Sequence, residues 1–210
     1  ERIIFKRKHY RQITCISEQC KKEIVNHYKV SPHTIEIIYN GVNISIFTPK
    51  NRTTYRDTVR ATYGIAPDEV LLLFVGSGFK RKGLKYVIEA LSLINKSQKT
   101  KLLVVGKGTI REHQRLARKN GVLDKLIFAG VCKHIQEIYA GGDIFVFPSE
   151  YDAFGTACLE AMASGLPVIA SKSSGVSEII AQGQDGFVIH HPIDAREIAK
   201  YMNVLFTKEK

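Results

Sequence analysis

Two acidic residues that could take part in chemistry, Asp152 and Glu160, lie in one loop-and-helix segment. The apolar run Ile144 to Phe147 precedes Asp152 and is typical of a buried strand, and Glu160 falls inside a helix predicted for 154–164. A second apolar strand, predicted for 167–170, follows at once. Because the two acids are eight positions apart, they would not share one face of a continuous helix. They converge only if the loop with Asp152 curls back over the helix start; the alternative is a capped helix beside a solvated loop.

The start of this helix has the residues of an anion site. Gly155 would let a ligand approach the backbone, and Thr156 to Cys158 can present the free N–H groups of a first helical turn. In a doubly wound α/β sheet, ligands bind at the carboxyl ends of strands, where such N–H groups and the positive end of a helix dipole meet an anion.

Two further glycine-containing turns follow apolar runs. Gly76 and Gly78 come directly after the run at 70–75, and three adjacent cations, Lys80 to Lys82, come next. This turn lacks the third glycine of a dinucleotide fingerprint, and it lacks the Lys and Ser or Thr that end a P-loop. Its residues suit the neutralisation of a diphosphate, and the alternative is a solvated basic turn. Gly106 follows the next apolar run and indicates another turn open to close approach, or simply a βα turn.

The strands that must position these residues recur regularly. Six short apolar runs are predicted as strands: 70–75, 101–105, 126–129, 144–147, 167–170 and 186–189. The helices predicted to follow them cover 83–95, 109–120, 134–141, 154–164, 175–182 and 194–206. Strands that are apolar throughout, each followed by a helix, are typical of a parallel sheet covered on both faces. We therefore predict an α/β fold, a Rossmann-like doubly wound parallel sheet, over residues 70–210.

The beginning of the chain differs from this pattern. Residues 1–11 read as the end of a basic helix, and Ser17 reads as the N-cap of the helix in a small strand, helix, strand unit predicted at 13–17, 18–28 and 35–39. Since this unit is too small to bury both faces of its own sheet, we expect residues 1–41 to be the remnant of an N-terminal domain. A turn follows, and 42–69 is predicted to be an interdomain linker.

The composition indicates a globular chain with excess positive charge. It has 44% hydrophobic residues and 31 Lys and Arg against 20 Asp and Glu, a net charge of +11. Because this charge is spread over several regions, nucleic acid is not the expected partner; nucleotides, phosphorylated sugars and anionic lipid surfaces also attract basic proteins. No apolar run reaches the ~18 residues that a membrane-spanning helix needs. The four cysteines form no CxxC pair and are predicted to be buried free thiols in a reducing compartment.

Other catalytic schemes lack their motifs. The sequence contains no GxSxG, no HExxH and no DxD, the last being the usual metal-diphosphate anchor of a different glycosyltransferase architecture. His134, His190 and His191 read as surface or capping residues, and Glu178 reads as a structural residue near a helix start. The candidate chemistry therefore stays at the strand ends.

Taken together, these segments resemble the C-terminal half of a GT-B glycosyltransferase of the large retaining family 4. The resemblance covers almost the whole chain. The segments that carry it are, in order, ISEQCKKEIVNHYKV, IIYNGVN with FTP, FVGSGFKRKG, LLVVGKG, IFAG, IYAGGDIFVFPSEYDAFGTACLEAMASGLPVIAS, GVSEII and GFVI. The stretch GFKRKG is most similar to the lipopolysaccharide-core glucosyltransferase branch.

The resemblance implies a nucleotide-sugar site on the sheet domain, because the family holds its donor mainly with the C-terminal of two Rossmann domains. Arg81 and Lys82 would contact the diphosphate. Glycines at Gly76, Gly78 and Gly106 would line the site, and the donor phosphate or sugar would be held with help from the N–H groups of Phe154, Gly155, Thr156 and Ala157.

Three further positions take roles from the same resemblance. Glu160, the second acid of the family's E-x7-E motif, would accept hydrogen bonds from the ribose hydroxyls, and Val131 would lie beside the base. Asp152 occupies the place of the first acid. Most members have Glu there, so the sequence departs from the family by one methylene and leaves the contact of Asp152 with the donor sugar open.

The implied activity is transfer of a hexose from a nucleotide-diphosphate sugar, a UDP-sugar, to a polysaccharide or lipopolysaccharide acceptor with retention. No metal or other cofactor is implied. A saccharide or lipid-linked saccharide acceptor would bind the N-terminal domain of a full-length bacterial protein, which would be cytoplasmic and peripheral to the inner membrane. The isolated fragment would then transfer little. The alternative is a catalytically inactive module of the same fold that binds nucleotide-sugar or regulates.

Overall fold

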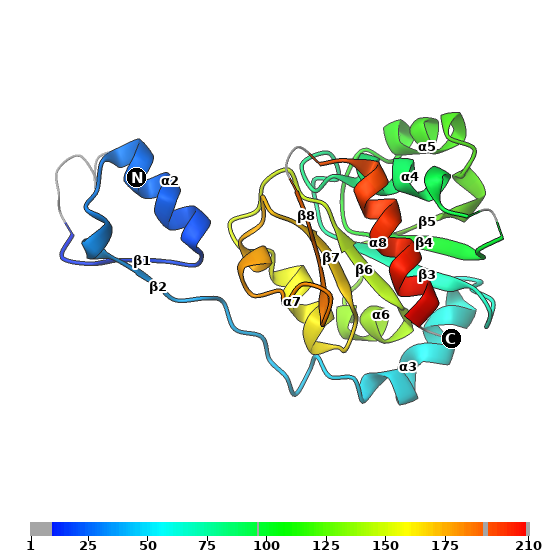
Figure 1. Ribbon diagram of the computed structural model, residues 1–210. Helices are drawn as coiled ribbons and strands as arrows, with labels where there is room; N and C mark the ends of the chain where they lie inside the picture. The colour runs from blue at the N-terminus through cyan, green and yellow to red at the C-terminus, as the bar shows by residue number, and fades with distance from the viewer. Residues whose placement is uncertain (1–9, 96, 191–192, 209–210) are drawn as a thin grey trace.

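The central element is a sheet of six parallel strands. The computed structural model describes residues 10–95, 97–190 and 193–208, and in it the strands are arranged in the order β5-β4-β3-β6-β7-β8 (Figure 1). Their bounds are β3 (Val70–Val75), β4 (Thr100–Val105), β5 (Leu126–Gly130), β6 (Ile144–Phe147), β7 (Val168–Ser171) and β8 (Gly186–Ile189). The predicted doubly wound parallel sheet is confirmed, and each of the six predicted strands lies within one residue of its observed bounds.

Helices cover both faces of this sheet (Figure 1). One layer holds α4 (Leu84–Leu93), α5 (Ile110–Lys119) and α8 (Ala195–Lys208), and the other holds α3 (Asn51–Thr62), α6 (Ile135–Gly141) and α7 (Thr156–Ala163). Alternate residues of β3 serve the two layers: Leu72 and Phe74 pack with the first, whereas Leu71 and Leu73 pack with the second. Such side chains each contribute ~1.5–3 kcal/mol of burial free energy, which explains why the strands are apolar without alternation.

One predicted helix is wrong. Instead of a helix over 175–182, the chain forms only a four-residue 3₁₀ helix, η3 (Gly175–Glu178). Gly183, with φ +80°, then turns the chain back, and the Gly183 N–H donates to Gly186 at the start of β8. The apolar residues of 175–182 pack on the sheet without continuing a helix. A further short 3₁₀ helix, η2 (Leu123–Lys125), leads into β5.

The opening unit forms its own small sheet. Strand β1 (Ile13–Cys15) pairs in parallel with β2 (Ile35–Ile37), and α2 (Glu18–Tyr28) and the 3₁₀ helix η1 (Pro32–Thr34) connect them. The predicted N-cap is confirmed, because Ser17 Oγ accepts a hydrogen bond from Cys20 N at 3.1 Å. The basic helix predicted at 1–11 falls almost wholly outside the described residues.

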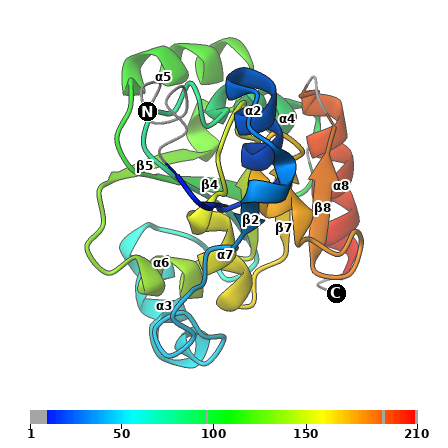
Figure 2. The ribbon, with the colours of Figure 1, turned by 90° about the vertical axis from the view of Figure 1, so that its left-hand side faces the viewer.

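Helix α2 lies in front of the sheet's strand ends, as Figure 2 shows, and its first turn is held there by a distant carboxylate. Glu178 accepts hydrogen bonds from the backbone N–H groups of Glu18 at 2.8 Å and Gln19 at 2.9 Å. Ser17 Oγ also donates to the carbonyl oxygen of Ala153 at 2.8 Å. Glu178, read from the sequence as structural, therefore completes the cap of a helix 160 residues earlier in the chain.

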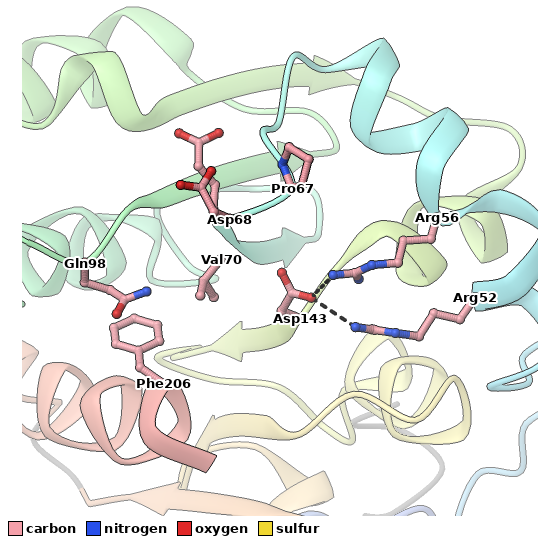
Figure 3. A pocket seen from close by; sticks show the side chains of 9 residues that line it. Arg52, Arg56, Pro67, Asp68, Val70, Gln98, Asp143 and Phe206 are labelled. Carbon is pink, nitrogen blue, oxygen red and sulfur yellow. Dashed lines mark hydrogen bonds and ion pairs between the residues drawn. The ribbon is translucent and has the colours of Figure 1, made fainter. Parts of the chain in front are cut away.

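The range 42–69, predicted to be a linker, contains a helix fixed to the sheet domain. Helix α3 sends three arginines to the buried carboxylate of Asp143, which directly precedes β6. Figure 3 shows two of them, Arg52 and Arg56, pointing to Asp143. The nitrogen–oxygen distances are 3.1 Å from Arg52, 2.7 Å from Arg56 and 3.0 Å from Arg60. Part of the predicted linker is thus bound to the domain by charge. No helix within the described ranges is both long and apolar enough to cross a membrane.

Candidate functional site

The predicted site residues gather at the carboxyl edge of the sheet, around the ends of β3 and β6. These two strands are neighbours at the centre of the sheet, and the strand order reverses direction between them. The chain leaves β3 through the loop at 76–83 and leaves β6 through the loop at 148–155. In doubly wound sheets, a crevice at this reversal point is where ligands bind.

An ion pair joins the two loops. The Lys82 ammonium binds the Asp152 carboxylate, and the two side chains are only 13% and 15% exposed. Lys82 Nζ also lies 4.9 Å from the centroid of the Phe147 ring, at the end of β6. Arg81 is more exposed, and its Nη1 donates to the carbonyl oxygen of Tyr151 at 2.8 Å. Both predicted diphosphate ligands therefore contact the loop that carries Asp152.

Close backbone packing explains the glycines of this edge. A Cβ on Gly106, where φ is +127°, would lie 2.2 Å from the carbonyl oxygen of Gly76. A Cβ on Gly83, where φ is +77°, would lie 1.9 Å from the carbonyl oxygen of Pro148. Gly78 has a similar φ of +79° but nothing within 4 Å of its virtual Cβ, so the space above it is open. Of these glycines, Gly78 leaves the backbone most accessible to a ligand.

The start of α7 presents backbone donors toward the same edge. Gly155 takes φ +95° and leads into α7, and within the described part of the chain no acceptor is seen for the N–H groups of Gly155, Thr156 and Ala157. The N–H of Phe154, also predicted to contact the donor, instead donates to Asp152 Oδ1 at 3.2 Å. Three of the four predicted backbone donors are therefore available to an anion, and the fourth is bound to Asp152.

Glu160 lies in the second turn of α7 and is half-buried. Its Oε2 accepts a hydrogen bond of 3.0 Å from the hydroxyl of Tyr139, on α6. Burial raises the pKa of Glu160 above its usual value, because the ionised form loses solvation, and the hydrogen bond from Tyr139 acts in the opposite direction. The two acids of the segment thus have separate partners: Asp152 pairs with Lys82, and Glu160 with Tyr139.

Val131 lies at the same edge, directly after β5, and is 61% exposed. Because β5 is an outer strand, separated from β3 by β4, Val131 stands farther along the edge than the two central loops. An exposed valine offers an apolar surface on which a flat base could rest. The structure therefore places Val131 along one edge with Arg81, Lys82 and α7 without bringing it into contact with them.

Two hollows flank the loop that contains Glu150 and Tyr151. One has a volume of about 400 Å³ and is lined by Gly78, Phe79, Lys80, Arg81, Gly108, Thr109 and Glu150. The other, of about 780 Å³, lies between α2 and the loops that follow β6 and β7. A third hollow of about 440 Å³, drawn in Figure 3, opens beside Val70 and Asp143 at the amino ends of the strands, away from every predicted site residue.

Several residues that shape the site were missed in the sequence. Tyr139 positions Glu160, and Glu150 forms an ion pair of 2.8 Å with Lys85, the main cause of its lowered pKa. Buried Ser149 donates to the carbonyl oxygen of Tyr151 at 2.9 Å. These contacts join segments 21 to 65 residues apart or depend on the local path of a loop, so no spacing rule could have found them.

The described residues hold no group of three or more His, Cys, Asp or Glu side chains arranged to bind a metal ion. Of the histidines read as surface or capping residues, His190 is exposed and contacts Glu197 at 2.8 Å. His134 stands at the N-cap of α6 without a side-chain cap, and His191 lies outside the described residues.

The chain is similar in sequence to known proteins. The chain is 31% identical over 85% of its length to an uncharacterized glycosyltransferase of Methanocaldococcus jannaschii, of which it covers 47%. It is 29% identical over 99% of its length to the lipopolysaccharide glucosyltransferase WaaG of Escherichia coli, covering 56% of it. The chain thus spans about half the length of the curated relatives it matches.

Solved structures show the same fold. The crystal structure of WaaG superposes with a TM-score of 0.86 at 28% identity, over 94% of this chain and 54% of that one. The C-terminal domain of a group 1 glycosyl transferase, LpcC from Francisella tularensis, superposes with a TM-score of 0.68 at 28% identity, over 80% of this chain and 88% of that domain. The resemblance to the C-terminal half of a GT-B enzyme is confirmed.

The family model described as "Glycosyl transferases group 1" matches residues 55–210, from α3 to the end of the chain. This range contains both loops of the carboxyl edge and both acids of the segment after β6. The chain therefore belongs to the group 1 glycosyl transferases.

Proposed function

We propose that this chain is the donor-binding half of a retaining glycosyltransferase, which transfers a hexose from a UDP-sugar to a polysaccharide or lipopolysaccharide acceptor. The observation that carries the proposal is the convergence of Arg81, Lys82 and the free N–H groups of α7 at the reversal point of the sheet. The likeness to WaaG, named a lipopolysaccharide glucosyltransferase, supports the acceptor class. The proposed setting is the bacterial cytoplasm, with the full-length protein peripheral to the inner membrane.

The arrangement suits the departure of a nucleoside diphosphate. When the bond between sugar and phosphate breaks, negative charge develops on the diphosphate, so fixed cations and a helix amino end stabilise the transition state more than the ground state. Arg81 and Lys82 would supply the cations. Gly155 to Ala157 would supply the amide donors. With these groups in place no metal ion is needed, and we propose that none is used.

Lys82 must exchange its partner for this to happen. In the structure its ammonium is bound to Asp152, so an incoming diphosphate competes with that carboxylate. Glu160 would accept hydrogen bonds from the ribose hydroxyls, and Val131 would contact the base. An acceptor saccharide would be bound mainly by the part of the protein that the relatives have and this chain does not cover.

Calorimetric titration with UDP, GDP and ADP, each free and sugar-linked, in the presence of EDTA, tests the donor assignment. The matched variants are the adjacent pair Arg81→Ala and Lys82→Ala and, as a control, the adjacent pair Arg118→Ala and Lys119→Ala on the exposed face of α5. We expect saturable binding to uridine nucleotides, unchanged in the control and lost in the site variant. Binding that needs a divalent ion, or that survives loss of Arg81 and Lys82, would contradict the proposal.

A second candidate function is a nucleotide-sugar-binding module without catalysis. The observation that favours it is the shorter acid at position 152, held by Lys82 instead of reaching into open space. Transfer assays on the full-length chain decide between the two. The catalytic proposal expects transfer that falls by at least ten-fold in Asp152→Ala and Glu160→Ala; a full-length protein that binds UDP-sugar and transfers nothing would leave the binding module as the better account.

A further inference from the structure

Tyr139 is a polar residue in the least exposed part of the domain. Its side chain is 0% exposed, and its ring lies 5.9 Å from the ring of Phe145 and 5.9 Å from that of Phe47. A phenylalanine would fill almost the same volume without the need to satisfy a buried hydroxyl. The buried hydroxyl of Tyr139 therefore needs hydrogen-bond partners.

The hydroxyl touches two groups of α7, and both are acceptors. Tyr139 Oη lies 3.0 Å from the carbonyl oxygen of Ala157 and 3.0 Å from Glu160 Oε2. A phenol has one proton to donate. When Glu160 is ionised, that proton is shared between the carboxylate and the carbonyl. When Glu160 is protonated, its own proton can be donated to the phenol oxygen, and the phenol can donate fully to Ala157.

We infer that Tyr139 is a positioning residue. Its hydroxyl binds Glu160 Oε2, so that Oε1 is left to accept a hydrogen bond from the ribose of the nucleotide. Nucleotide binding then depends on the ionised form of Glu160. This inference rests on the proposed function. Oε1 has no hydrogen-bond partner among the described residues, whereas Oε2 is bound by Tyr139. One oxygen is thus fixed by the protein, and the other is left for a ligand.

The electrostatics agree with this geometry. Burial raises the pKa of Glu160, and Tyr139 is the titratable group that opposes this by donating to the carboxylate. Cys158, also on α7, is the other titratable group near the phenol, and burial raises its pKa so that it stays neutral. Loss of the phenol proton donor would therefore raise the pKa of Glu160 further. On acidification, the variant would then lose affinity for a ribose at a higher pH than the wild type.

Two probes separate positioning from a general structural role. UDP carries a ribose, whereas inorganic pyrophosphate has the same charged group and no ribose. Titrations of both with this chain, from pH 5 to pH 8, would use Tyr139→Phe, Glu160→Gln and the double variant. Tyr201→Phe is the matched control, because Tyr201 also pairs with a glutamate, Glu197, but on α8, away from the site.

We expect Tyr139→Phe to weaken UDP binding three- to ten-fold at pH 7.5, to move the acid-side loss of affinity to higher pH, and to leave pyrophosphate binding unchanged. Glu160→Gln should remove the part of the pH dependence that comes from Glu160 and leave the part that comes from protonation of the terminal phosphate of UDP. In the Glu160→Gln background, Tyr139→Phe should have no further effect on the pH profile. Tyr201→Phe should match the wild type with both probes.

The outcomes against the inference differ from those against the proposed function. A wild-type chain that does not bind UDP removes the proposed function itself. A chain that binds UDP through Glu160, with Tyr139→Phe unchanged or with UDP and pyrophosphate weakened equally, overturns the inference alone. If Tyr139→Phe does not fold, carbon-13 NMR of the wild type decides. The chemical shift of Tyr139 Cζ should change with pH as Glu160 titrates. A chemical shift that does not change with the titration of Glu160 overturns the inference.

Discussion

The ammonium of Lys82 and the carboxylate of Asp152 form an ion pair that joins the loop after β3 to the loop after β6. The same carboxylate accepts a hydrogen bond from the N–H of Phe154 through its other oxygen. Asp152 therefore occupies two groups that a donor diphosphate would also use. Its carboxylate thus binds the ammonium and the N–H group that are proposed to bind the diphosphate.

We expect Asp152→Asn to tighten UDP binding. The amide keeps an oxygen for the Phe154 N–H but no longer competes for the charge of Lys82, and a partly buried ion pair of this kind corresponds to roughly three- to ten-fold in affinity. Calorimetry on the variant measures this. Asp57→Asn, which removes an exposed acid of α3, is the control for net charge. An affinity equal to or below that of the wild type would show that the ion pair does not compete with the ligand.

Substitution of two glycines with the same backbone conformation should have unequal effects on stability. Gly83 and Gly78 have φ of +77° and +79°, but a Cβ on Gly83 would lie 1.9 Å from the Pro148 oxygen whereas one on Gly78 meets nothing within 4 Å. We expect Gly78→Ala to cost about 1–2 kcal/mol of unfolding free energy, from backbone strain alone. Gly83→Ala should cost more, because the loop after β6 must move. Urea unfolding compares the two, and equal costs would mean that this loop yields freely.

Removal of the Asp143 carboxylate should destabilise the domain strongly. Its side chain is 4% exposed and faces three arginines, and its Oδ2 also accepts from the Leu71 N–H at 2.7 Å. In Asp143→Ala, the cluster of Arg52, Arg56 and Arg60 loses its counter-charge, and deletion of one partner from a buried ion pair costs ~3–5 kcal/mol. Urea unfolding measures the loss. Asp68→Ala, which breaks the exposed pair with Lys99, is the control and should change the midpoint little.

The Asp143 carboxylate should also make the free energy of unfolding depend on pH. Burial alone would raise the pKa of Asp143, but the Leu71 N–H together with Arg56 and Arg60 outweighs burial and lowers it below the usual 3.8. A lowered pKa means that the stabilisation is complete above pH 3.8 and is lost as the pH falls through the lower, folded-state value. The gap between the unfolding midpoints of wild type and Asp143→Asn should therefore narrow as the pH falls below 3.8. A gap that stays constant from pH 6 to below pH 3.8 would contradict this assignment.

Thiol labelling should report on the nucleotide. Cys15 and Cys158 are buried, and burial raises the pKa of both thiols, so both should react slowly. Cys132 and Cys20 are partly exposed and should react faster. Because Cys132 follows Val131, the proposed base contact, UDP should slow labelling of Cys132 and leave Cys20 unaffected. Mass spectrometry of the labelled peptides follows each cysteine. If UDP does not slow the labelling of Cys132, the base binds elsewhere.

Local pattern was sufficient to predict the sheet, because each strand is buried on both faces and is therefore apolar along its whole length. It was also sufficient to locate the amino end of α7 after Gly155, although the Cys158 N–H, predicted to be free, donates to the Gly155 carbonyl oxygen at 2.9 Å. The helix at 175–182 failed for the opposite reason. Its apolar residues pack in the core, but the Ala181 N–H donates to Asp185 Oδ1 at 2.9 Å instead of to a helical carbonyl oxygen, and the chain turns at Gly183 toward β8.

Contacts between distant segments could not be predicted from the local sequence pattern. Nothing in the order of residues indicates that Glu160 contacts Tyr139, or that Arg52, Arg56 and Arg60 converge on Asp143 more than 80 positions away. The arginines recur every four residues, which marks one face of a helix, yet a linker was predicted there. The pairing of Lys82 with Asp152 could not be foreseen either, because the family resemblance assigns each residue to the ligand and not to the other.

The cap on α2 has a consequence for the order of events during synthesis. Helix α2 leaves the ribosome about 160 residues before Glu178, which receives the first two of its backbone N–H groups. Until Glu178 emerges and η3 forms, that end of the helix is completed only by Ser17 and by water. A nascent chain stalled before residue 178 should therefore show a frayed α2 in hydrogen exchange, and protection should appear only once the late segment has been translated.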